Sequence, residues 1–431
     1  MRPTTSTATR WSWTEAGGRS SRCRKVSALA PFRVRSFRFQ WPADLVTSWA
    51  FEMEALILGW YVLATTGSVQ LLVVVGALAW LGSLFAPFFG IAGDRIGVRR
   101  LLCLTRGGYA LLAALLAWLT LSGRLEPWHV LVVAGLAGLM KPSDMAMRHV
   151  LVGHTIPSES LMGALAISRT TSDTARIFGA IAGTGGVALI GMGQAYAGVS
   201  LIYVGAFLFS LGVAPVHASG AQVRILTGLK EGVRYVWDKP DLLGAFSLAF
   251  LVNFLAYPFF LGLLPYVARN VYGMEQSGLG WLAGAFAVGA LAGSLVVSAN
   301  RLPLRAARVM LLSSALWFVL ILVFGQVRSA GTGIAILFLV GFVQSFCMTP
   351  IAAVMLRASS EEMRGRVMGI RMLAIWGLPL GLVASGPIIA GLGFAATTLI
   401  YGGLGLAATV AIGYRWQQAL WEKRAAANAH L

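Results

Sequence analysis

The sequence of 431 residues contains little charge, since only 12% of its residues are Asp, Glu, Lys or Arg whereas 57% are hydrophobic. Its mean hydropathy is +0.75. So little polar surface cannot cover a water-soluble core, which excludes a soluble globular domain. The alternating ten-residue segments of a membrane barrel are also missing. We therefore predict an all-α membrane protein, and because each span needs about 20 apolar residues, the length accommodates about a dozen spans.

Residues that carry enzyme chemistry are equally scarce. The five histidines lie mostly at predicted helix ends or in the C-terminal tail, and none forms a metal-ligand pair. The three cysteines, Cys23, Cys103 and Cys347, have no CxxC spacing, so we interpret them as packing residues. The sequence has no nucleophile elbow and no phosphate-binding G-x-x-x-x-G-K segment. We therefore expect no enzyme, no cofactor and no metal.

Apolar segments joined by short polar turns predict twelve spanning helices, because a backbone in hydrocarbon must satisfy its own hydrogen bonds. The strongest polar interruption, residues 218–240, separates six segments from six more. The predicted organisation is a disordered basic cytoplasmic tail (1–32), six helices (33–217), a cytoplasmic linker (218–240), six helices (241–415) and a C-terminal cytoplasmic tail (416–431). The predicted spans are 41–65, 69–92, 101–122, 128–150, 161–190, 194–217, 241–267, 276–299, 307–327, 331–355, 366–391 and 394–415.

Basic residues are abundant but unevenly distributed. The net charge of +18 is concentrated in the N-terminal tail and in every second loop, whereas the alternate loops contain only Arg124, Arg269 and Arg328. This alternation follows the positive-inside rule and places both termini in the cytoplasm. The distribution thus indicates a multi-pass protein of a bacterial inner membrane and argues against a nucleic-acid partner.

The linker contains an amphipathic segment. Lys230 and Arg234 are four residues apart on one face of a predicted helix, whereas Leu229, Val233, Val236 and Trp237 belong to the other. This is the layout of an interfacial helix on an anionic leaflet.

A charged turn, GIAGDRIGVRR at residues 90–100, separates the second and third predicted spans. It fits the pattern G-x-x-x-D-R-x-G-x-R-R and resembles the signature loop of the major facilitator superfamily, with Val98 where the family usually has a basic residue. We expect Asp94 to latch two bundles together by binding the start of the eleventh span near residues 364–367, where free N–H groups favour an anion. The matching residues of this gating loop are Gly90, Asp94, Arg95, Gly97, Arg99 and Arg100.

Two further segments resemble one branch of that superfamily, which includes the enterobactin exporter and related drug-efflux proteins. They are LKEGVRYVWDKPDLL in the linker and EEMRGRVMGI at residues 361–370, and the likeness covers residues 33–415. The resemblance implies the major facilitator fold, in which two six-helix bundles surround a central cavity that opens alternately to each side of the membrane.

Acidic residues in the first span are candidates for proton coupling or substrate binding. An ionised side chain at a helix centre costs about 2.5–3.5 kcal/mol on insertion scales, so Asp44, Glu52 and Glu54 need a reason to be there. Glu52 and Glu54 are rotated by about 200° from each other and cannot share a face. Neither has a cation within a turn of its own helix, so we favour a proton or substrate role over a structural ion pair with an intramembrane arginine.

The fifth span carries Arg169, Asp173 and Arg176 on one stripe, where Asp173 can pair with either arginine. A salt bridge that makes the helix insertable and a role in substrate binding both remain open. Arg176 matches the arginine that precedes the family's Gly-Pro motif on this helix. Here Gly179-Ala180 replaces Gly-Pro, a motif that the resemblance associates with antiporters.

Other intramembrane charges lie in the fourth and eleventh spans. Lys141 and Asp144 are three residues apart, so we expect them to neutralise each other. Arg371 can attract an anionic substrate or pair with Glu54, and we favour the pairing. The predicted cavity lining of the second bundle is Asn253, Tyr257, Gln344 and Trp376.

Together these features predict a monomeric secondary transporter that exports a small organic molecule in exchange for protons. Two alternatives remain. One is a lipid or lysophospholipid transporter of the same fold. The other is a non-transporting membrane scaffold or sensor, which has no use for carboxylates in the middle of a span.

Overall fold

The computed structural model describes residues 30–85, 96–215, 225–299 and 305–420. All regular elements within these ranges are helical. The first half contains the 3-10 turn η1 (Ala30–Arg33), α1 (Arg35–Thr66), α2 (Val69–Leu78), the 3-10 turn η2 (Leu81–Phe85), α4 (Val98–Leu121), α5 (Pro127–Thr155), α6 (Ser158–Ile190) and α7 (Met192–Leu211).

The linker helix α8 (Ile225–Trp237) leads into the second half of the chain. This half contains α9 (Pro240–Leu255), α10 (Pro258–Leu261), α11 (Leu264–Tyr266), the π-turn η3 (Val267–Val271), α12 (Gln276–Ser298), α13 (Ala306–Phe324), α14 (Ala330–Ala358), η4 (Glu361–Met363), α15 (Arg364–Leu373), η5 (Ala374–Trp376), α16 (Gly377–Arg415) and α17 (Gln417–Leu420).

Seven helical segments of the described residues are long and apolar enough to cross a membrane: α4, α5, α7, α12, α13, α14 and the stretch from α15 to α16. The long helices α1 and α6 are not among them. Both carry the intramembrane acids and arginines that the sequence singled out, and these residues lower their hydropathy. The charged side chains of α1 and α6 therefore need partners on other helices if these two helices are to lie in a membrane.

Prolines and one glycine shape the second half. The predicted span 241–267 is interrupted after Leu255, because Pro258 and Pro265 cannot donate backbone hydrogen bonds and begin new short helices. The predicted spans 366–391 and 394–415 join in α16, where Gly393 has φ 83° and ψ 169°. This left-handed conformation favours glycine and marks the bend between the two predicted spans.

Close helix packing inside the second bundle depends on small residues. A Cβ atom on Gly341 of α14 would lie 2.0 Å from the carbonyl oxygen of Phe286 in α12, and one on Gly289 would lie 2.0 Å from that of Phe338. Glycine therefore lets these two backbones touch, as is common between membrane helices.

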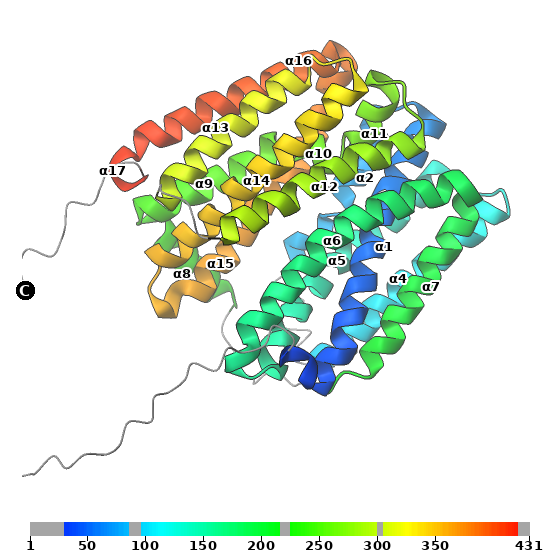
Figure 1. The fold of residues 1–431 in the computed structure, drawn as a ribbon, viewed down its shortest axis with the longest axis horizontal. Coiled ribbons are helices and arrows are strands. Elements are labelled where there is room, and N and C mark those ends of the chain that lie inside the picture. The colour runs from blue at the N-terminus through cyan, green and yellow to red at the C-terminus, as the bar shows by residue number, and fades with distance from the viewer. Residues whose placement is uncertain (1–29, 86–95, 216–224, 300–304, 421–431) are drawn as a thin grey trace, which may run out of the picture.

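Figure 1 shows two groups of helices, α1 to α7 and α9 to α17, which lie closest around α2, α10, α11 and α12 and diverge towards α8. We call the end where α1 finishes and α12 begins the distal end. The two groups make close contacts in this half: a Cβ on Gly280 would lie 2.2 Å from Thr184 Oγ1, and one on Gly59 would lie 3.1 Å from Pro265 Cγ. Arg269 also donates to the Leu63 carbonyl across the groups.

Candidate transport site

A cavity of about 240 Å³ lies between the two bundles. Residues 260–265 and α12 supply its wall on the side of the second bundle, and every lining residue from there is Phe, Leu, Gly, Pro or Ala. The first bundle supplies its lining from α1, α2, α5 and α6. The ionisable lining residues all belong to the first bundle and are Glu52, Glu54, Lys141, Arg148 and Arg176. The cavity therefore has one apolar wall and one charged wall.

Glu52 of α1 pairs with a cation from α6. Its Oε1 atom lies 3.8 Å from Arg176 Nε, and the two side chains are 37% and 33% exposed. This ion pair with an intramembrane arginine is the alternative that we did not favour from the sequence, and its cation comes from another helix. Gly179 brings the helices together, since a Cβ there would lie 2.7 Å from the Glu52 Cβ. An ion pair this exposed is worth about 0–1 kcal/mol, so a ligand can displace it at little cost.

Glu54 has a different environment, as expected from its rotation relative to Glu52. It is only 8% exposed, and the Tyr203 hydroxyl of α7 donates a hydrogen bond of 2.6 Å to its Oε2 atom. The favoured pairing with Arg371 is not formed. Within the described part of the chain, Arg371 has no carboxylate at ion-pair distance, and it does not line the cavity.

Lys141 of α5 also contacts the cavity, where its ammonium group lies against two aromatic rings. Its Nζ atom lies 4.7 Å from the ring centroid of Trp80 and 5.2 Å from that of Phe51, within the range of cation–π attraction. The prediction that Lys141 neutralises Asp144 is wrong. Asp144 is fully buried and instead contacts arginines.

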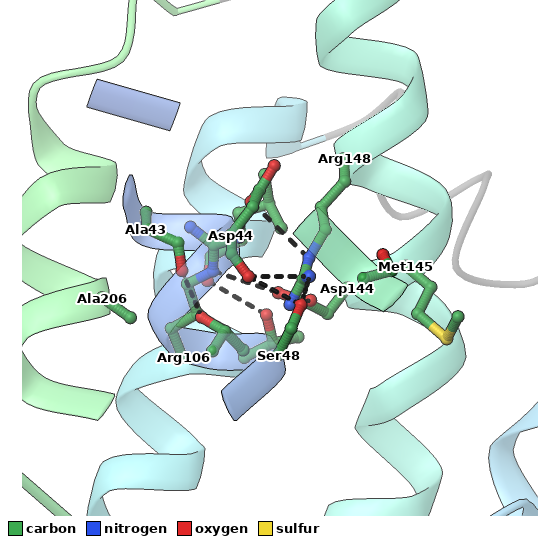
Figure 2. A network of polar contacts seen from close by, with 12 residues as sticks. Ala43, Asp44, Ser48, Arg106, Asp144, Met145, Arg148 and Ala206 are labelled. Carbon is green, nitrogen blue, oxygen red and sulfur yellow. Dashed lines mark hydrogen bonds and ion pairs between the residues drawn. The ribbon is translucent and has the colours of Figure 1, made fainter. Parts of the chain in front are cut away.

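Two arginines and two aspartates form a network near the predicted cytoplasmic end of the first bundle (Figure 2). Arg106 of α4 pairs with Asp44 of α1, and its Nε atom lies 3.1 Å from Oδ1 of Asp144 in α5. Arg148 of α5 pairs with Asp144, and its Nε atom lies 3.6 Å from Asp44 Oδ1. The charges balance, and Arg106 is only 1% exposed.

Neutral side chains add hydrogen bonds to this network. Arg106 donates to Ser210 Oγ of α7 at 2.6 Å, and Arg148 donates to Ser48 Oγ of α1 at 2.8 Å. Gln40 Nε2 donates to the Arg148 carbonyl at 3.0 Å. Since Arg148 also lines the cavity, the network connects the packing of the four helices α1, α4, α5 and α7 to the charged wall.

The charged stripe of α6 is divided between two partners. Arg169 Nε lies 3.4 Å from Asp173 Oδ2, and Asp173 is buried whereas the Arg169 side chain is 61% exposed. Arg176 turns to Glu52 instead. Of the two arginines that the spacing allowed as partners, Asp173 therefore pairs with Arg169.

Half of the gating loop can be described. Gly90, Asp94 and Arg95 lie outside the described residues, so the latch between Asp94 and residues 364–367 stays a prediction. Gly97 precedes α4 with φ 88°, and Arg99 donates to the Leu211 carbonyl at the end of α7 at 2.6 Å. Helix-terminal carbonyls lack intrahelical donors, which makes this carbonyl a natural partner for Arg99; the Arg100 side chain is exposed.

The predicted lining residues of the second bundle lie away from this cavity. Gln344 donates to the Tyr257 hydroxyl at 2.6 Å, and Asn253 donates to the Ala249 carbonyl of its own helix at 2.8 Å. Asn253, Tyr257, Gln344 and Trp376 do not line the cavity. The second bundle lines it instead with residues 260–265, from the broken segment after α9, and with residues of α12. The role of the four predicted residues in transport stays a prediction.

Comparison with known proteins identifies the class. The model of the Major Facilitator Superfamily matches residues 43–378, and the chain belongs to this superfamily. It is therefore a membrane transporter and not an enzyme. Relatives include the multidrug efflux pump Tap of Mycolicibacterium fortuitum, 27% identical over 356 residues, which covers 78% of this chain and 84% of that protein. The pump Tap of Mycobacterium tuberculosis is 26% identical over 354 residues, with 78% and 82% covered.

Solved structures of the same fold are more distant in sequence. The nucleoside transporter NupG superposes with a TM-score of 0.71 at 12% identity, covering 90% of this chain and 99% of that one. A bacterial homologue of the human lysosomal transporter Spinster gives a TM-score of 0.70 at 12% identity, with 90% and 99% covered. A D-xylose–proton symporter gives 0.67 at 12% identity, with 88% and 97% covered. These likenesses establish the major facilitator fold.

Proposed function

We propose that the protein exports a small organic molecule across a bacterial inner membrane in exchange for protons. The observation that carries the proposal is the central cavity, which sets two carboxylates, Glu52 and Glu54, opposite a wall without polar side chains. An organic molecule with an apolar body and a polar or cationic group fits both walls. The names of the two efflux-pump relatives support export rather than import.

The two carboxylates have different tasks in this proposal. Glu52 is half-exposed and weakly paired with Arg176, so it meets the substrate and releases the arginine when substrate binds. Glu54 is buried and has a neutral hydrogen-bond donor, Tyr203. Glu54 is therefore the group that binds a proton from one side of the membrane and releases it on the other.

The contacts between bundles suggest which side is open. Under the predicted topology the distal end faces outwards, and the contacts of Gly280 with Thr184 and of Gly59 with Pro265 close that side. Substrate enters from the cytoplasm in this arrangement. When the bundles rock to the opposite state, the substrate leaves outwards and a proton from outside binds Glu54. When they rock back, Glu54 releases that proton into the cytoplasm, so each cycle moves one substrate molecule out and one proton in.

Proteoliposome flux tests the proposal, with ethidium as the probe and with and without an imposed pH gradient. We expect the gradient to accelerate ethidium flux in the wild type and in an Arg328→Gln control. Glu54→Gln removes the acceleration, and Glu52→Gln lowers flux at every gradient. If both glutamate variants retain full gradient-driven flux, the proton site is elsewhere. Movement of a fluorescent lysophospholipid without ethidium flux supports the alternative of a lipid transporter.

A further inference from the structure

One face of α8 is fixed to the second bundle. Gly232 is buried against α15, where a Cβ would lie 3.3 Å from Ile370 Cγ1 and 3.4 Å from Arg366 Cβ. Val236, one turn later, is 3% exposed. Glu231 adds an ion pair at the edge of this face, with 2.5 Å between its Oε2 atom and Arg366 Nη1. The helix is thus held at the start of the eleventh span.

The opposite face of α8 is exposed and combines cations with large apolar side chains. We call Lys230, Val233, Arg234 and Trp237 the α8 stripe. At about 100° per residue these positions share an arc of roughly 100°, away from Gly232 and Val236. The prediction that Val233 and Trp237 lie on the face opposite the cations is therefore wrong, because both are exposed beside Lys230 and Arg234. All four are exposed, Trp237 by 70% and Val233 by 41%. An exposed tryptophan beside two cations needs an occupant that is both apolar and anionic.

We propose that the α8 stripe binds the anionic phospholipids of the predicted cytoplasmic leaflet. The position supports a lipid occupant, because α8 ends at Trp237 and the apolar helix α9, which opens the predicted seventh span, begins at Pro240. The stripe therefore lies at headgroup depth, where tryptophan partitions and each basic residue adds attraction to anionic lipid.

The neighbouring charges are consistent with this occupant. Asp238 lies 3.8 Å from Arg234, but both side chains are highly exposed, so a lipid phosphate can replace it. Glu231 faces Arg366, and Lys239 donates to the Tyr235 hydroxyl. Lys230 and Arg234 thus remain directed to the outside. Because the other face of α8 holds α15, lipid bound to the stripe also restrains the helix that begins the eleventh span.

The test places an environment-sensitive fluorophore (NBD) on a cysteine at position 233 of the full chain, in a background without Cys23, Cys103 and Cys347. The labelled protein is reconstituted in phosphatidylcholine vesicles with increasing phosphatidylglycerol. We expect a blue shift that grows with the anionic fraction and weakens in high salt. The Lys230→Gln/Arg234→Gln variant should require an at least about tenfold higher anionic fraction for the same shift.

The matched control is Arg124→Gln/Arg328→Gln, which removes the same charge from the predicted outer loops and should leave the shift unchanged. A monodisperse gel-filtration peak establishes that each variant is folded. The proposal is overturned if the spectrum is the same in both lipids, or if removing Lys230 and Arg234 has no effect. A shift that depends on an added cytoplasmic extract instead of on lipid composition also overturns it, in favour of a protein partner.

Discussion

Tyr203 and Glu54 are joined by a hydrogen bond of 2.6 Å in which the phenol donates to the carboxylate. Tyr203 is fully buried and Glu54 is 8% exposed, so the bond is largely shielded from water. The bond links α1 to α7 beside the rings of Tyr109 and Phe51, whose centroids are 5.3 Å and 6.0 Å from that of Tyr203. A group proposed to exchange protons is therefore also a packing element of the first bundle.

This bond predicts a measurable coupling between the two side chains. Tyr203→Phe leaves a buried acceptor without its donor and should lower the free energy of unfolding by about 1–3 kcal/mol. In a double-mutant cycle with Glu54→Gln, measured by denaturant titration in detergent, the two effects should not add. Tyr196→Phe is the control, because that buried hydroxyl has no hydrogen-bond partner among the described residues. Strict additivity for Tyr203 and Glu54 would contradict the prediction.

Arg106 should be the most sensitive charge in the chain. Arg106→Gln leaves the partly buried Asp44 and the buried Asp144 with Arg148 alone, and breaking a buried pair costs about 3–5 kcal/mol. We expect a large loss of folded protein by fluorescence-detected gel filtration, partly restored by adding Asp144→Asn. Arg328→Gln, at an exposed arginine, should change stability by no more than about 0.5 kcal/mol. Wild-type abundance of Arg106→Gln would show that the network is dispensable.

Two glycines provide a matched test of close packing. Gly341→Ala forces a methyl group to within 2.0 Å of the Phe286 carbonyl oxygen, so α14 must move away from α12. At Gly403 in α16, nothing lies within 4 Å of a new Cβ. Gly403→Ala should therefore be neutral or stabilising by about 0.5–1 kcal/mol, because alanine is the better helix former. Gly341→Ala should lower the apparent melting temperature, and equal thermal stability of the two variants would refute the packing argument.

Tyr235 of α8 predicts a pH dependence outside the membrane. Its hydroxyl accepts hydrogen bonds from Lys239 Nζ at 2.6 Å and from the Ser360 N–H at 3.1 Å, and these donors lower the pKa of Tyr235 from 10.0 to about 8. Because the folded-state pKa is depressed, the contribution to stability is complete above about pH 10 and is lost as the pH falls through about 8. Absorbance at 295 nm should show a step near pH 8 that Tyr235→Phe abolishes and Lys239→Gln moves upwards. A first step that survives Tyr235→Phe belongs to another tyrosine.

The orientation of the chain can be measured directly by labelling single cysteines from outside the cell in a background without native cysteines. Positions 124 and 328 should react, and position 230 should be protected until the membrane is permeabilised. The basis is the alternation of basic loops, which sets topology through the cytoplasmic retention of Lys and Arg. The reverse pattern of labelling would invert the proposed direction of transport as well.

The helical plan was readable from the sequence because hydrophobic length and turn residues are local properties. The distinct environments of Glu52 and Glu54 also followed from helical rotation alone. Partners were harder to predict, because a sequence shows which residues are neighbours on one helix but not which side chains of different helices meet. Asp144 was assigned to Lys141, three residues away, whereas its partners are Arg148 and, from another helix, Arg106.

Arg106 itself was overlooked although a signal existed. It is the lone charge in the predicted span 101–122, and the insertion cost that singled out Glu52 applies to it equally. The apolar wall of the cavity could not be predicted in the same way. It comes from the segment after α9, where Pro258 and Pro265 break the helix, and the position of a broken segment depends on the helices around it.

The charge network also constrains how the chain is made. Asp44 is synthesised 62 residues before its partner Arg106, so α1 reaches the bilayer with a carboxylate that nothing yet neutralises. An unpaired charge makes a helix a poor membrane segment by itself. The first helix therefore has to wait beside the insertion machinery until α4 and α5 arrive. A chain that ends before α4 should be extracted and degraded, however apolar the rest of α1 is.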